Sequence, residues 1–503
     1  MKRPIIVALA GAALAVAIFT PTAGATPSTN AITWSGVCSD PALANAGAEC
    51  GTLDVPLDPA NPRGKTITLA LSRVRHKVAE NAYQGVVLGA PDALTGSGLN
   101  MSLLGGRLPN GAGGAYDWIG FARRGQAPSA PAIACNPGYF EYNRPYYVPA
   151  TPAAEQQWLS RVKGYADACA NNAPADLLDH MKTVDMAADM DAIRTALGVE
   201  RVNVFAQSYG TYLAQVYATK YPGRVRRMVL DSIVDPRRVW YGAGAFDQNV
   251  PLERNLEIWF DWLASHDDAY HLGKTRQDLR NVWNAQLQKL ATAPAGGVIG
   301  PSEWIDVFLF PSYFQQSWPL LGGVLSNWVT NGDAAALKAF FSQVYHSGGE
   351  GTYAPQLAQL CTDAPWPTNW AQWHADTVAS HAQAPDTTWG QTWANAPCAF
   401  WPARSGYPVT VNGSWGQTAL LIDETLDAAT PFEGSLEVRS RFPSAALISV
   451  PGGTNHAGTL SGNGCVDSKI ADYLTTGALP RRKPGRMADV ECAPLPLPTP
   501  TTP

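Results

Sequence analysis

The segment that most constrains the fold is residues 202–211, which read Val-Asn-Val-Phe-Ala-Gln-Ser-Tyr-Gly-Thr. An apolar, β-branched run stops at Ser208, and a helical pattern begins directly after it. The positions two before and two after this serine are Ala206 and Gly210, as small as a very tight strand-to-helix turn requires. This pattern is typical of a nucleophile elbow, which lifts a serine hydroxyl out of a sheet at a helix N-terminus. The segment therefore predicts a hydrolase that acts through an acyl-enzyme.

Strand and helix patterns alternate around this segment. An amphipathic run predicts a helix that Thr183 caps, that continues through Leu197 and that ends before Gly198. Short apolar runs predict strands at residues 52–57, 66–71, 85–88, 118–121, 202–205 and 225–230. This alternation predicts an α/β fold, a mostly parallel sheet with helices on both faces.

The composition of the chain changes after Asp235-Pro236. Thirteen of the 17 tryptophans fall between Trp240 and Trp401, in a helical pattern that Pro and Gly interrupt. Sheet-like runs return at residues 419–422 and 445–450. We therefore predict a core of residues 26–236 and 406–492 with a mainly helical, Trp-rich cap inserted at 237–405; an independent domain is the alternative. The Pro/Thr-rich residues 493–503 predict a disordered tail.

The N-terminus has the features of a secretory signal peptide. Lys2 and Arg3 precede an apolar run, and Ala23-Gly24-Ala25 has the small-x-small form of a cleavage site. Residues 1–25 are therefore predicted to be removed after Ala25, which gives a secreted protein without stable membrane association. A membrane anchor is the alternative, but the apolar run is short for a span.

The chain has eight cysteines, an even number that favours disulfides in an exported protein. None of them forms a CxxC pair, which argues against zinc and redox sites. Pairing between sequence neighbours is our hypothesis, since sequence alone does not fix connectivity. The expected pairs are Cys38–Cys50, Cys135–Cys169, Cys361–Cys398 and Cys465–Cys492.

Charge and motif content exclude several classes of function. The formal net charge of −5 gives no basic surface of the kind that nucleic-acid binding needs, so we expect no nucleic-acid partner. The sequence contains no HExxH motif, no P-loop and no dinucleotide-binding glycine set. We therefore predict neither a metal nor a cofactor.

Two segments after Ser208 supply the partners that a serine nucleophile needs. In α/β-hydrolases the order along the chain is serine, acid, histidine. A strand pattern at residues 419–422 leads into a loop with three carboxylates, of which Asp427 is our choice and Asp423 the alternative. Of the eight histidines only His456 follows this acid, in a loop of small residues after the next strand. We predict Ser208 as nucleophile, His456 as base and Asp427 as the orienting acid.

With these motifs in place, the chain resembles the secreted bacterial tripeptidyl aminopeptidases, proline-iminopeptidase-like α/β-hydrolases with a characteristic C-terminal segment. The resemblance covers nearly the whole mature chain and implies an α/β-hydrolase fold, the same three catalytic residues, and release of short peptides from free N-termini. It also implies peptide as the substrate partner, while related proteins hydrolyse esters. The segments that carry it are residues 208–213 (Ser-Tyr-Gly-Thr-Tyr-Leu), 225–232 (Val-Arg-Arg-Met-Val-Leu-Asp-Ser) and 426–431 (Leu-Asp-Ala-Ala-Thr-Pro), then His456 followed by Cys465-Val466 and Tyr473-Leu474.

The chain departs from the family pattern near the expected oxyanion hole. Ala206 stands where the family has Gly, residues 92–98 keep only the last three positions of Gly-Gly-Pro-Gly-Gly-Ser-Gly, and residues 122–125 read Ala-Arg-Arg-Gly in place of Asp-Pro-Arg-Gly. The backbone N–H groups of Tyr209 and Ala93 are the predicted oxyanion donors. Loss of one such donor typically costs about 10²–10³ in kcat.

Three functions follow from this sequence. The first is a secreted exopeptidase, for which Glu424 and Glu253 are candidate carboxylates to bind the substrate α-ammonium group. The second is a secreted esterase on the same triad, because esters need less oxyanion stabilisation than amides. The third is a weakly active or non-catalytic peptide-binding relative, for which the altered residues 92–95 are the only support.

Overall fold

The computed structural model describes residues 31–92, 96–346, 349–413 and 418–501, so the predicted signal peptide lies outside the described residues. Within these ranges ten strands form one sheet in the order β1-β2-β3-β5-β4-β6-β7-β8-β9-β10. The strands are β1 (Thr33–Val37), β2 (Glu49–Pro56), β3 (Thr66–Val74), β4 (Val86–Ala90), β5 (Asp117–Phe121), β6 (Val202–Gln207), β7 (Val225–Asp231), β8 (Thr418–Glu424), β9 (Ala445–Val450) and β10 (Val490–Glu491).

The sheet is antiparallel at one edge and parallel elsewhere. β1, β2, β3 and β5 pair antiparallel, whereas β5 to β10 pair parallel in the sheet order. β6 lies between β4 and β7, with Leu88 opposite Val204 on one side and Met228 opposite Val204 on the other. A central strand covered on both faces needs a largely apolar run, as residues 202–206 provide apart from Asn203, whose Nδ2 donates to Val86 O at 2.9 Å. This is the α/β-hydrolase fold, and the predicted fold class is confirmed.

Short helices and connections cover the sheet around the site. The core helices are α1 (Pro41–Asn45), α3 (Ala175–Leu178), α4 (Thr183–Ala196), α5 (Tyr209–Lys220), α16 (Glu433–Arg441) and α17 (Gly464–Thr476), with 3₁₀ segments η1 (Glu80–Ala82), η2 (Leu99–Arg107) and η3 (Pro109–Ala115). α4 ends before Gly198, which has the positive φ expected there. The prediction that Thr183 caps this helix is wrong: Lys182 is the N-cap residue, and the Thr183 hydroxyl instead donates to Asp363.

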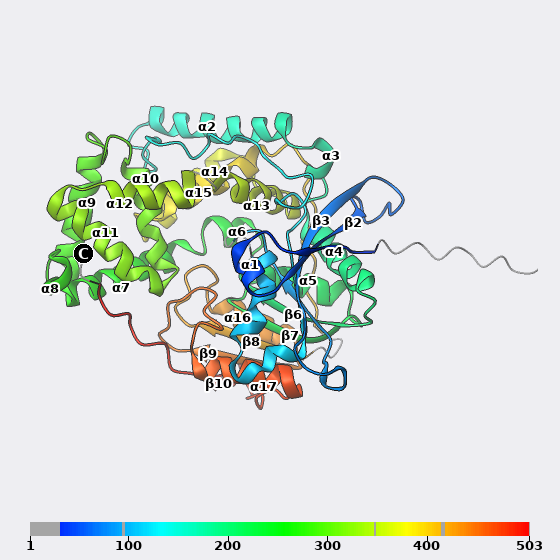
Figure 1. Ribbon diagram of the computed structural model, residues 1–503. Helices are drawn as coiled ribbons and strands as arrows, with labels where there is room; N and C mark the ends of the chain where they lie inside the picture. Colours follow the sequence, from blue (N-terminus) through cyan, green and yellow to red (C-terminus); the bar gives the residue numbers. More distant parts are fainter. Residues whose placement is uncertain (1–30, 93–95, 347–348, 414–417, 502–503) are drawn as a thin grey trace, which may run out of the picture.

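A second layer of helices covers one end of the sheet, and Figure 1 shows it as the green and yellow part above the core. Its aromatic cluster contains Trp259, Trp304, Trp318 and Trp393, and also Trp158 from α2 (Pro152–Asn172), which precedes the predicted cap. The helices of this layer after residue 236 are α6 (Tyr241–Ala245), α7 (Asn249–Ser265), α8 (Asp267–Tyr270), α9 (Arg276–Leu290), α10 (Pro301–Leu309), α11 (Trp318–Asn331), α12 (Ala335–Phe341), α13 (Gly349–Asp363), α14 (Trp370–His381) and α15 (Thr388–Asn395), with the shorter turns η4 (Phe310–Ser312), η5 (Gln315–Ser317), η6 (Ser342–His346) and η7 (Ala396–Phe400). We call this layer the cap.

The C-terminal tail differs from its prediction. Residues 493–501 form no helix or strand, but they run from β10 across to the cap, as the red trace in Figure 1 shows. The Trp262 indole N–H, on α7, donates to Pro498 O at 3.0 Å, and the Thr501 hydroxyl donates to Pro319 O at 3.4 Å. The predicted disorder is therefore wrong up to residue 501, because a buried indole N–H takes its acceptor from the tail.

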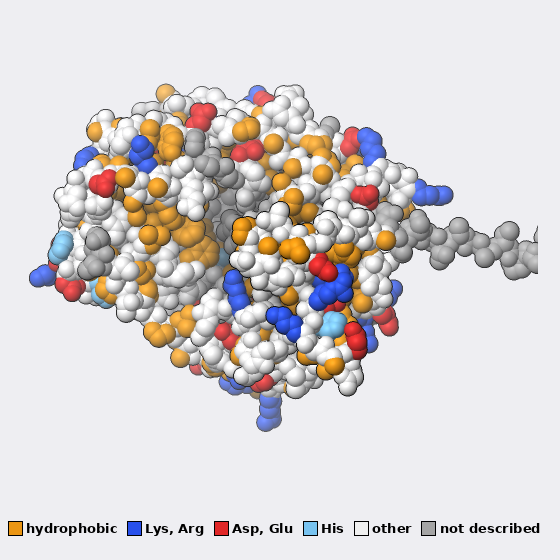
Figure 2. Space-filling view, in the orientation of Figure 1, with side chains coloured by type: hydrophobic (Ala, Val, Ile, Leu, Met, Phe, Trp, Pro, Cys, Tyr) orange, Lys and Arg blue, Asp and Glu red, His pale blue; other side chains and the backbone are white. Residues whose placement is uncertain are grey.

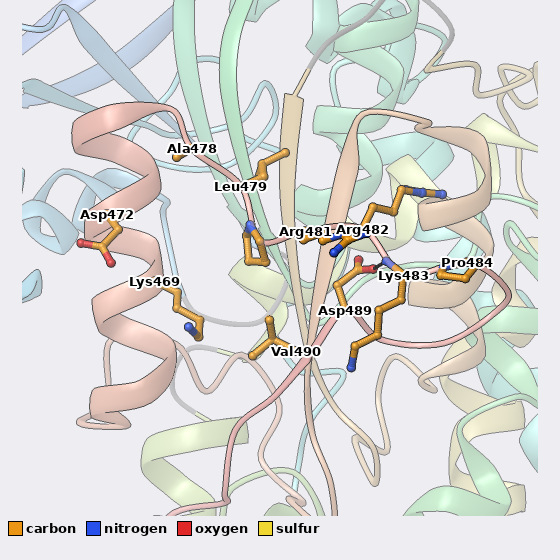
Figure 3. A pocket seen from close by; sticks show the side chains of 11 residues that line it. Lys469, Asp472, Ala478, Leu479, Arg481, Arg482, Lys483, Pro484, Asp489 and Val490 are labelled. Carbon is orange, nitrogen blue, oxygen red and sulfur yellow. Dashed lines mark hydrogen bonds between the residues drawn. The ribbon is translucent and has the colours of Figure 1, made fainter.

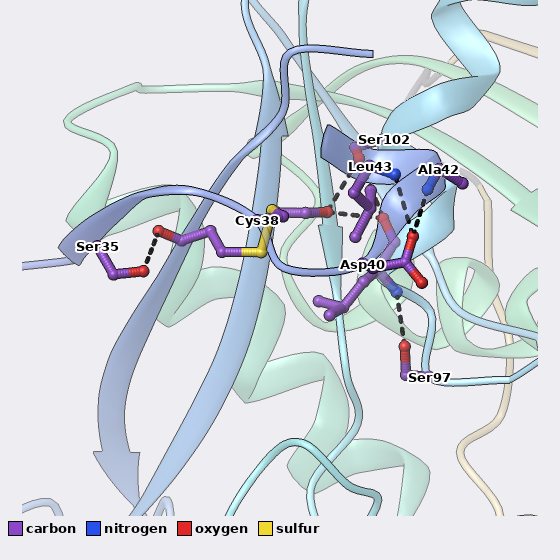
Figure 4. Close-up of a disulfide and its surroundings, with 10 residues drawn as sticks. Ser35, Cys38, Asp40, Ala42, Leu43, Ser97 and Ser102 are labelled. Atoms are coloured by element: carbon purple, nitrogen blue, oxygen red, sulfur yellow. Dashed lines mark hydrogen bonds between the residues drawn. A yellow bond between two sulfur atoms is a disulfide. The ribbon is translucent and has the colours of Figure 1, made fainter. Parts of the chain in front are cut away.

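Four disulfides join the cysteines in the pairs that the sequence analysis proposed: Cys38–Cys50, Cys135–Cys169, Cys361–Cys398 and Cys465–Cys492. Figure 4 shows the first, which ties the segment before α1 to β2 beside the Asp40 cap of that helix.

On the face in Figure 2, charged side chains of both signs are scattered, and apolar side chains gather on the cap. Among the described residues, no helix has both the length and the apolar character needed to span a bilayer.

Candidate active site

Ser208 occupies the turn between β6 and α5. Its backbone has φ 54° and ψ −130°, a strained conformation that a non-glycine residue keeps only where the surrounding structure enforces it. A Cβ on Gly210 would lie 2.5 Å from Ala90 O, so the second position after the serine accepts only glycine. The Ser208 N–H donates to Asp231 O at 3.0 Å, which ties the turn to β7. This geometry is that of a nucleophile elbow.

His456 and Asp427 approach this serine from the loops that follow β9 and β8. The distance from His456 Nε2 to Ser208 Oγ is 2.7 Å. His456 Nδ1 lies 2.9 Å from Asp427 Oδ2 and 3.1 Å from Asp427 Oδ1. All three residues are buried, although they lie far apart in the sequence. Proton transfer between serine and imidazole needs contacts of this length.

The loop after β8 presents Asp427 to the histidine. Asp427 Oδ1 accepts from Ala429 N at 2.8 Å and from Thr430 N at 3.1 Å, while Oδ2 accepts from the Thr430 hydroxyl at 3.0 Å. Asp423, the alternative acid, instead accepts from the Ser435 hydroxyl, and its Oδ1 has no hydrogen-bond partner among the described residues. The geometry therefore favours Asp427 over Asp423.

The charges of the buried groups Asp427, His456 and Asp423 depend on one another. Burial opposes ionisation of Asp427, but the contact with His456 outweighs it and holds the pKa of Asp427 below its usual range. Burial likewise disfavours the imidazolium, but Asp427 outweighs it and raises the pKa of His456 to about 9. Burial, and then the charge of Asp427, raise the pKa of Asp423 well above its usual range, so Asp423 is neutral when Asp427 is ionised.

The cap contacts the acid and histidine loops through Arg254, Asn255, Tyr313 and Gln315, and Asn255 also contacts Ser312. We call these five residues the cap clamp. On the acid loop, Leu426 O accepts from Arg254 Nη2 at 2.6 Å and from Asn255 Nδ2 at 2.9 Å. Asn255 Nδ2 also donates to Ser312 O at 3.0 Å.

On the histidine loop, the His456 N–H donates to Tyr313 O at 2.9 Å, and Gln315 N donates to Asn455 Oδ1 at 3.0 Å. The cap therefore fixes the positions of the acid and histidine loops as well as covering them. Sequence analysis missed these residues, because most of the contacts use backbone carbonyls and no side-chain pattern marks them.

A cavity of about 400 Å³ borders Ser208 between the core and the cap. Its wall contains the carboxylates Asp235, Asp247 and Glu433 and the guanidinium groups of Arg237 and Arg238. Asp235 pairs with Arg237 at 2.6 Å, and Asp247 pairs with Arg238 at 2.6 Å. The cavity thus combines carboxylates and cations beside Ser208, and sequence reasoning named none of these residues as part of a site.

The two predicted amine-binding carboxylates lie elsewhere. Neither Glu424 nor Glu253 belongs to the described lining of this cavity. Glu424 accepts from Asn455 N at 2.6 Å, and its burial raises its pKa to about 7. Burial, and then Asp386, raise the pKa of Glu253 to about 8, and its carboxylate contacts Arg280 at 3.1 Å within the cap. That prediction is corrected: both groups lie outside the cavity lining and hold protein segments, which sequence spacing does not reveal.

The comparison with known proteins adds a family to this geometry. A family model described as "TAP-like protein" matches residues 384–492, and a model described as "alpha/beta hydrolase fold" matches residues 108–290. The chain is 36% identical over 466 residues to a protein named tripeptidyl aminopeptidase from Streptomyces lividans, covering 90% of this chain and 85% of that one. The chain belongs to the tripeptidyl aminopeptidase family.

More distant relatives of this family member carry other names. The chain is 26% identical to a protein named serine protease Hip1 from Mycobacterium tuberculosis (strain ATCC 25618 / H37Rv), with 86% of each chain covered. It is 27% identical to a protein named carboxylesterase B from the same strain, with 86% of this chain and 85% of that one covered. The similarity therefore extends over the core and the cap in both cases.

The departures from the family pattern lie on one side of the elbow. Ala93, the second predicted oxyanion donor, lies outside the described residues. The Tyr209 N–H stands at the first position of α5, where a helix leaves the N–H without an intrahelical acceptor. The Arg123 Nε donates to Gln126 Oε1 at 3.1 Å, and Gln126 Nε2 donates to Gly96 O at 2.7 Å. Arg123, in the segment 122–125 that departs from the family pattern, is thereby linked through Gln126 to Gly96, the first described residue after the gap at 93–95.

Among the described residues, no group of three or more His, Cys, Asp or Glu side chains could hold a metal ion.

Proposed function

We propose that this family member is a secreted serine exopeptidase that releases tripeptides from the free N-termini of peptides. The observation that carries the proposal is the continuous contact from Ser208 Oγ to His456 Nε2 at 2.7 Å and from His456 Nδ1 to Asp427 at 2.9 Å. An oxygen, an imidazole and a carboxylate in this order activate serine for acyl transfer.

Each group has a defined role in the proposed reaction. Ser208 Oγ attacks the scissile carbonyl carbon while His456 Nε2 takes the hydroxyl proton, and Asp427 stabilises the imidazolium. The Tyr209 N–H donates to the oxyanion. The imidazolium then gives its proton to the leaving amine, which frees the C-terminal part of the peptide. Water, deprotonated by His456, then attacks the acyl-enzyme. The ester bond to Ser208 Oγ breaks, the imidazolium returns its proton to that oxygen, and the N-terminal tripeptide is released.

The cavity beside Ser208 supports a short peptide with a free amine. A substrate of this class carries one positive charge at its N-terminus, and the cavity wall offers Asp235, Asp247 and Glu433. The ammonium group would share or replace their arginine partners Arg237, Arg238 and Arg486. These carboxylates replace Glu424 and Glu253 in our proposal for the ammonium site. The name of the Streptomyces lividans relative supports the tripeptide length.

Export is part of the proposal. Four disulfides support folding in an oxidising compartment, and the residues before Ala25 have signal-peptide character. N-terminal sequencing of protein secreted by an expressing bacterium should begin at Thr26. A product that retains residues 1–25 in the membrane fraction would contradict export.

A panel of tripeptide arylamides tests the exopeptidase proposal. Substrates with a free N-terminus should be cleaved with a kcat/KM at least about 100-fold higher than their N-acetylated forms, because acetylation removes the charge that the carboxylates bind. Equal rates on both forms would exclude an aminopeptidase. Dipeptide and tetrapeptide arylamides test the length preference in the same assay.

An esterase on the same triad is the second candidate. Two observations favour it: residues 92–95 differ from the family pattern at the expected oxyanion loop, and one relative is named carboxylesterase B. Turnover of p-nitrophenyl acetate or butyrate without cleavage of any arylamide would establish this candidate in place of the peptidase.

A further inference from the structure

A second cavity lies at the end of the core away from the cap. Its volume is about 670 Å³, within the range of small-molecule sites. α17 and β10 bound it in the lower part of Figure 1, and Figure 3 shows its side chains close up. It shares no lining residue with the cavity beside Ser208, and its residues are Lys469, Asp472, Ala478, Leu479, Pro480, Arg481, Arg482, Lys483, Pro484, Asp489 and Val490.

The frame of this cavity is rigid. Arg439, which lies outside the lining, pairs with Asp489 through two contacts of 2.9 and 2.6 Å. The Lys483 backbone is held on both sides, since its N–H donates to Asp489 Oδ1 at 2.6 Å and its carbonyl accepts from Arg439 Nη2 at 2.7 Å. The Cys465–Cys492 disulfide joins the start of α17 to the residue after β10. The wall therefore keeps its shape without a ligand.

Two of the charged lining groups are already used by the protein. The carboxylate of Asp489 is occupied by Arg439 and by the Leu447 N–H at 2.7 Å. The Arg482 guanidinium donates to three backbone carbonyls, those of Arg439, Phe442 and Ala445, at the end of α16 and the start of β9. These contacts hold the segment 482–489 in place, so neither group is free to bind a ligand.

Three cations remain. Lys469, Arg481 and Lys483 form no ion pair with any carboxylate of the described part of the chain. Lys469 extends from α17 across the cavity towards Val490 (Figure 3). Besides Asp489, the lining contains one carboxylate, that of Asp472, so these three cations outnumber it. A concentration of positive charge is notable in a chain whose net charge is −5. A cavity wall with an excess of one sign of charge attracts ligands of the other sign.

The rest of the wall is apolar. Leu479, Pro480 and Val490 are half-buried, and Ala478 and Pro484 complete the apolar part of the lining. A ligand that fits must therefore carry a negative group for the cations and an apolar body for these residues. An inorganic anion would satisfy the cations alone and leave most of the 670 Å³ unfilled.

We propose that this cavity binds a small amphipathic anion, a phosphate or sulfate monoester with an apolar chain, through Lys469, Arg481 and Lys483. The proposal is independent of the function proposed above, because the two cavities share no residue. It assigns a non-catalytic ligand site to the C-terminal segment that closes the core.

Calorimetric titration of the mature protein with octyl phosphate, below the concentration at which it forms micelles, tests this proposal. We expect saturable binding of one equivalent, weaker binding of inorganic phosphate and no binding of octyl glucoside. The K469Q/R481Q/K483Q variant should weaken octyl phosphate binding by at least about tenfold, because it removes three charge-assisted contacts. Its arylamide or ester turnover should equal that of the parent protein.

The matched control is K163Q/K220Q/R224Q, which removes three exposed cations elsewhere and changes the net charge equally. It should leave octyl phosphate binding unchanged. Failure of octyl phosphate to bind saturably would overturn the proposal, and so would equal weakening by both triple variants, because binding would then reflect net charge alone. Equal affinity for inorganic phosphate and octyl phosphate would overturn the role of the apolar wall.

Discussion

The core and the cap contribute to the same site in different ways. The core supplies the three side chains of the proposed triad, each at the carboxyl end of a parallel strand: Ser208 after β6, Asp427 after β8 and His456 after β9. The cap supplies no member of this triad, but it holds the two loops that carry Asp427 and His456. The core thus determines which atoms can react, and the cap determines how well they are aligned. Variants in the two regions should therefore differ in kind as well as in size.

We expect the largest change in kcat from a substitution in the core, and the same experiment separates the two candidate acids. Asp427→Asn should lower kcat by about 10⁴-fold, because an amide neither fixes the histidine tautomer nor stabilises the imidazolium. The matched variant is Asp423→Asn, which replaces a carboxyl group that is neutral beside ionised Asp427. It should keep kcat within a few fold of the parent. The reverse ranking of the two variants in an arylamide or ester assay would transfer the role to Asp423.

Sequence reasoning identified the core elements because each is a short, local pattern. A strand run followed by a small-residue turn marks Ser208, and strand ends followed by polar loops mark Asp427 and His456. The family resemblance, now confirmed, had implied the same three positions. The order serine, acid, histidine needs no knowledge of packing. The fold class could be predicted for the same reason.

The cap clamp could not be predicted, because most of its acceptors are backbone carbonyls, those of Leu426, Ser312 and Tyr313. Two predictions for acidic residues are wrong for the same reason. Nothing in the sequence shows that Glu424 accepts a hydrogen bond from Asn455 N or that Glu253 pairs with Arg280. Roles of this kind depend on tertiary contacts, which the spacing of residues in the sequence does not reveal.

A substitution in the cap should lower kcat less than one in the core, because it disturbs only the alignment of the triad. Asn255→Ala leaves the carbonyls of Ser312 and Leu426 without this donor in a buried setting, a loss of about 1–3 kcal/mol. If that energy aligns the acid loop, kcat falls by roughly 10- to 100-fold while KM changes little. The apparent pKa of the reaction should shift as well, because the contact between Asp427 and His456 changes.

Asn249→Ala is the control for this effect. Asn249 lies on the same helix, is equally buried and donates only within the cap, to Ala245 O at 3.0 Å and Ser380 Oγ at 2.9 Å. Thermal unfolding should show similar losses of stability in both variants, whereas kcat should fall only in Asn255→Ala. Equal losses of kcat would mean that the cap acts through stability alone.

The pH dependence tests the charge state that the core imposes. His456 acts as a base only when neutral, and its pKa is raised to about 9. kcat/KM should therefore rise about tenfold per pH unit from pH 7 and level off near pH 9. The same raised pKa stabilises the folded state below the ordinary imidazole pKa of about 6.5, and this contribution is lost as the pH rises through 9. A profile that is flat above pH 7 would contradict this charge state.

The smallest effect is expected from the tail that joins the core to the cap. Removal of residues 494–503 deprives the Trp262 indole N–H of Pro498 O, a loss of about 1 kcal/mol that should lower the Tm by about 1–3 °C. kcat should stay close to that of the parent, since the cap clamp is untouched. Removal of residues 502–503 alone is the control and should leave the Tm unchanged. A large loss of kcat on the longer truncation would show that the tail also positions the cap.

Labelling with a fluorophosphonate tests most directly whether the three side chains form a working nucleophile. The reagent should attach to the folded protein once, and mass spectrometry of the digest should place the adduct on Ser208. His456→Ala should abolish the reaction, because the base that activates the hydroxyl is gone. Absence of labelling in the folded parent protein, or an adduct only on another residue, would contradict the proposal that Ser208 is the nucleophile.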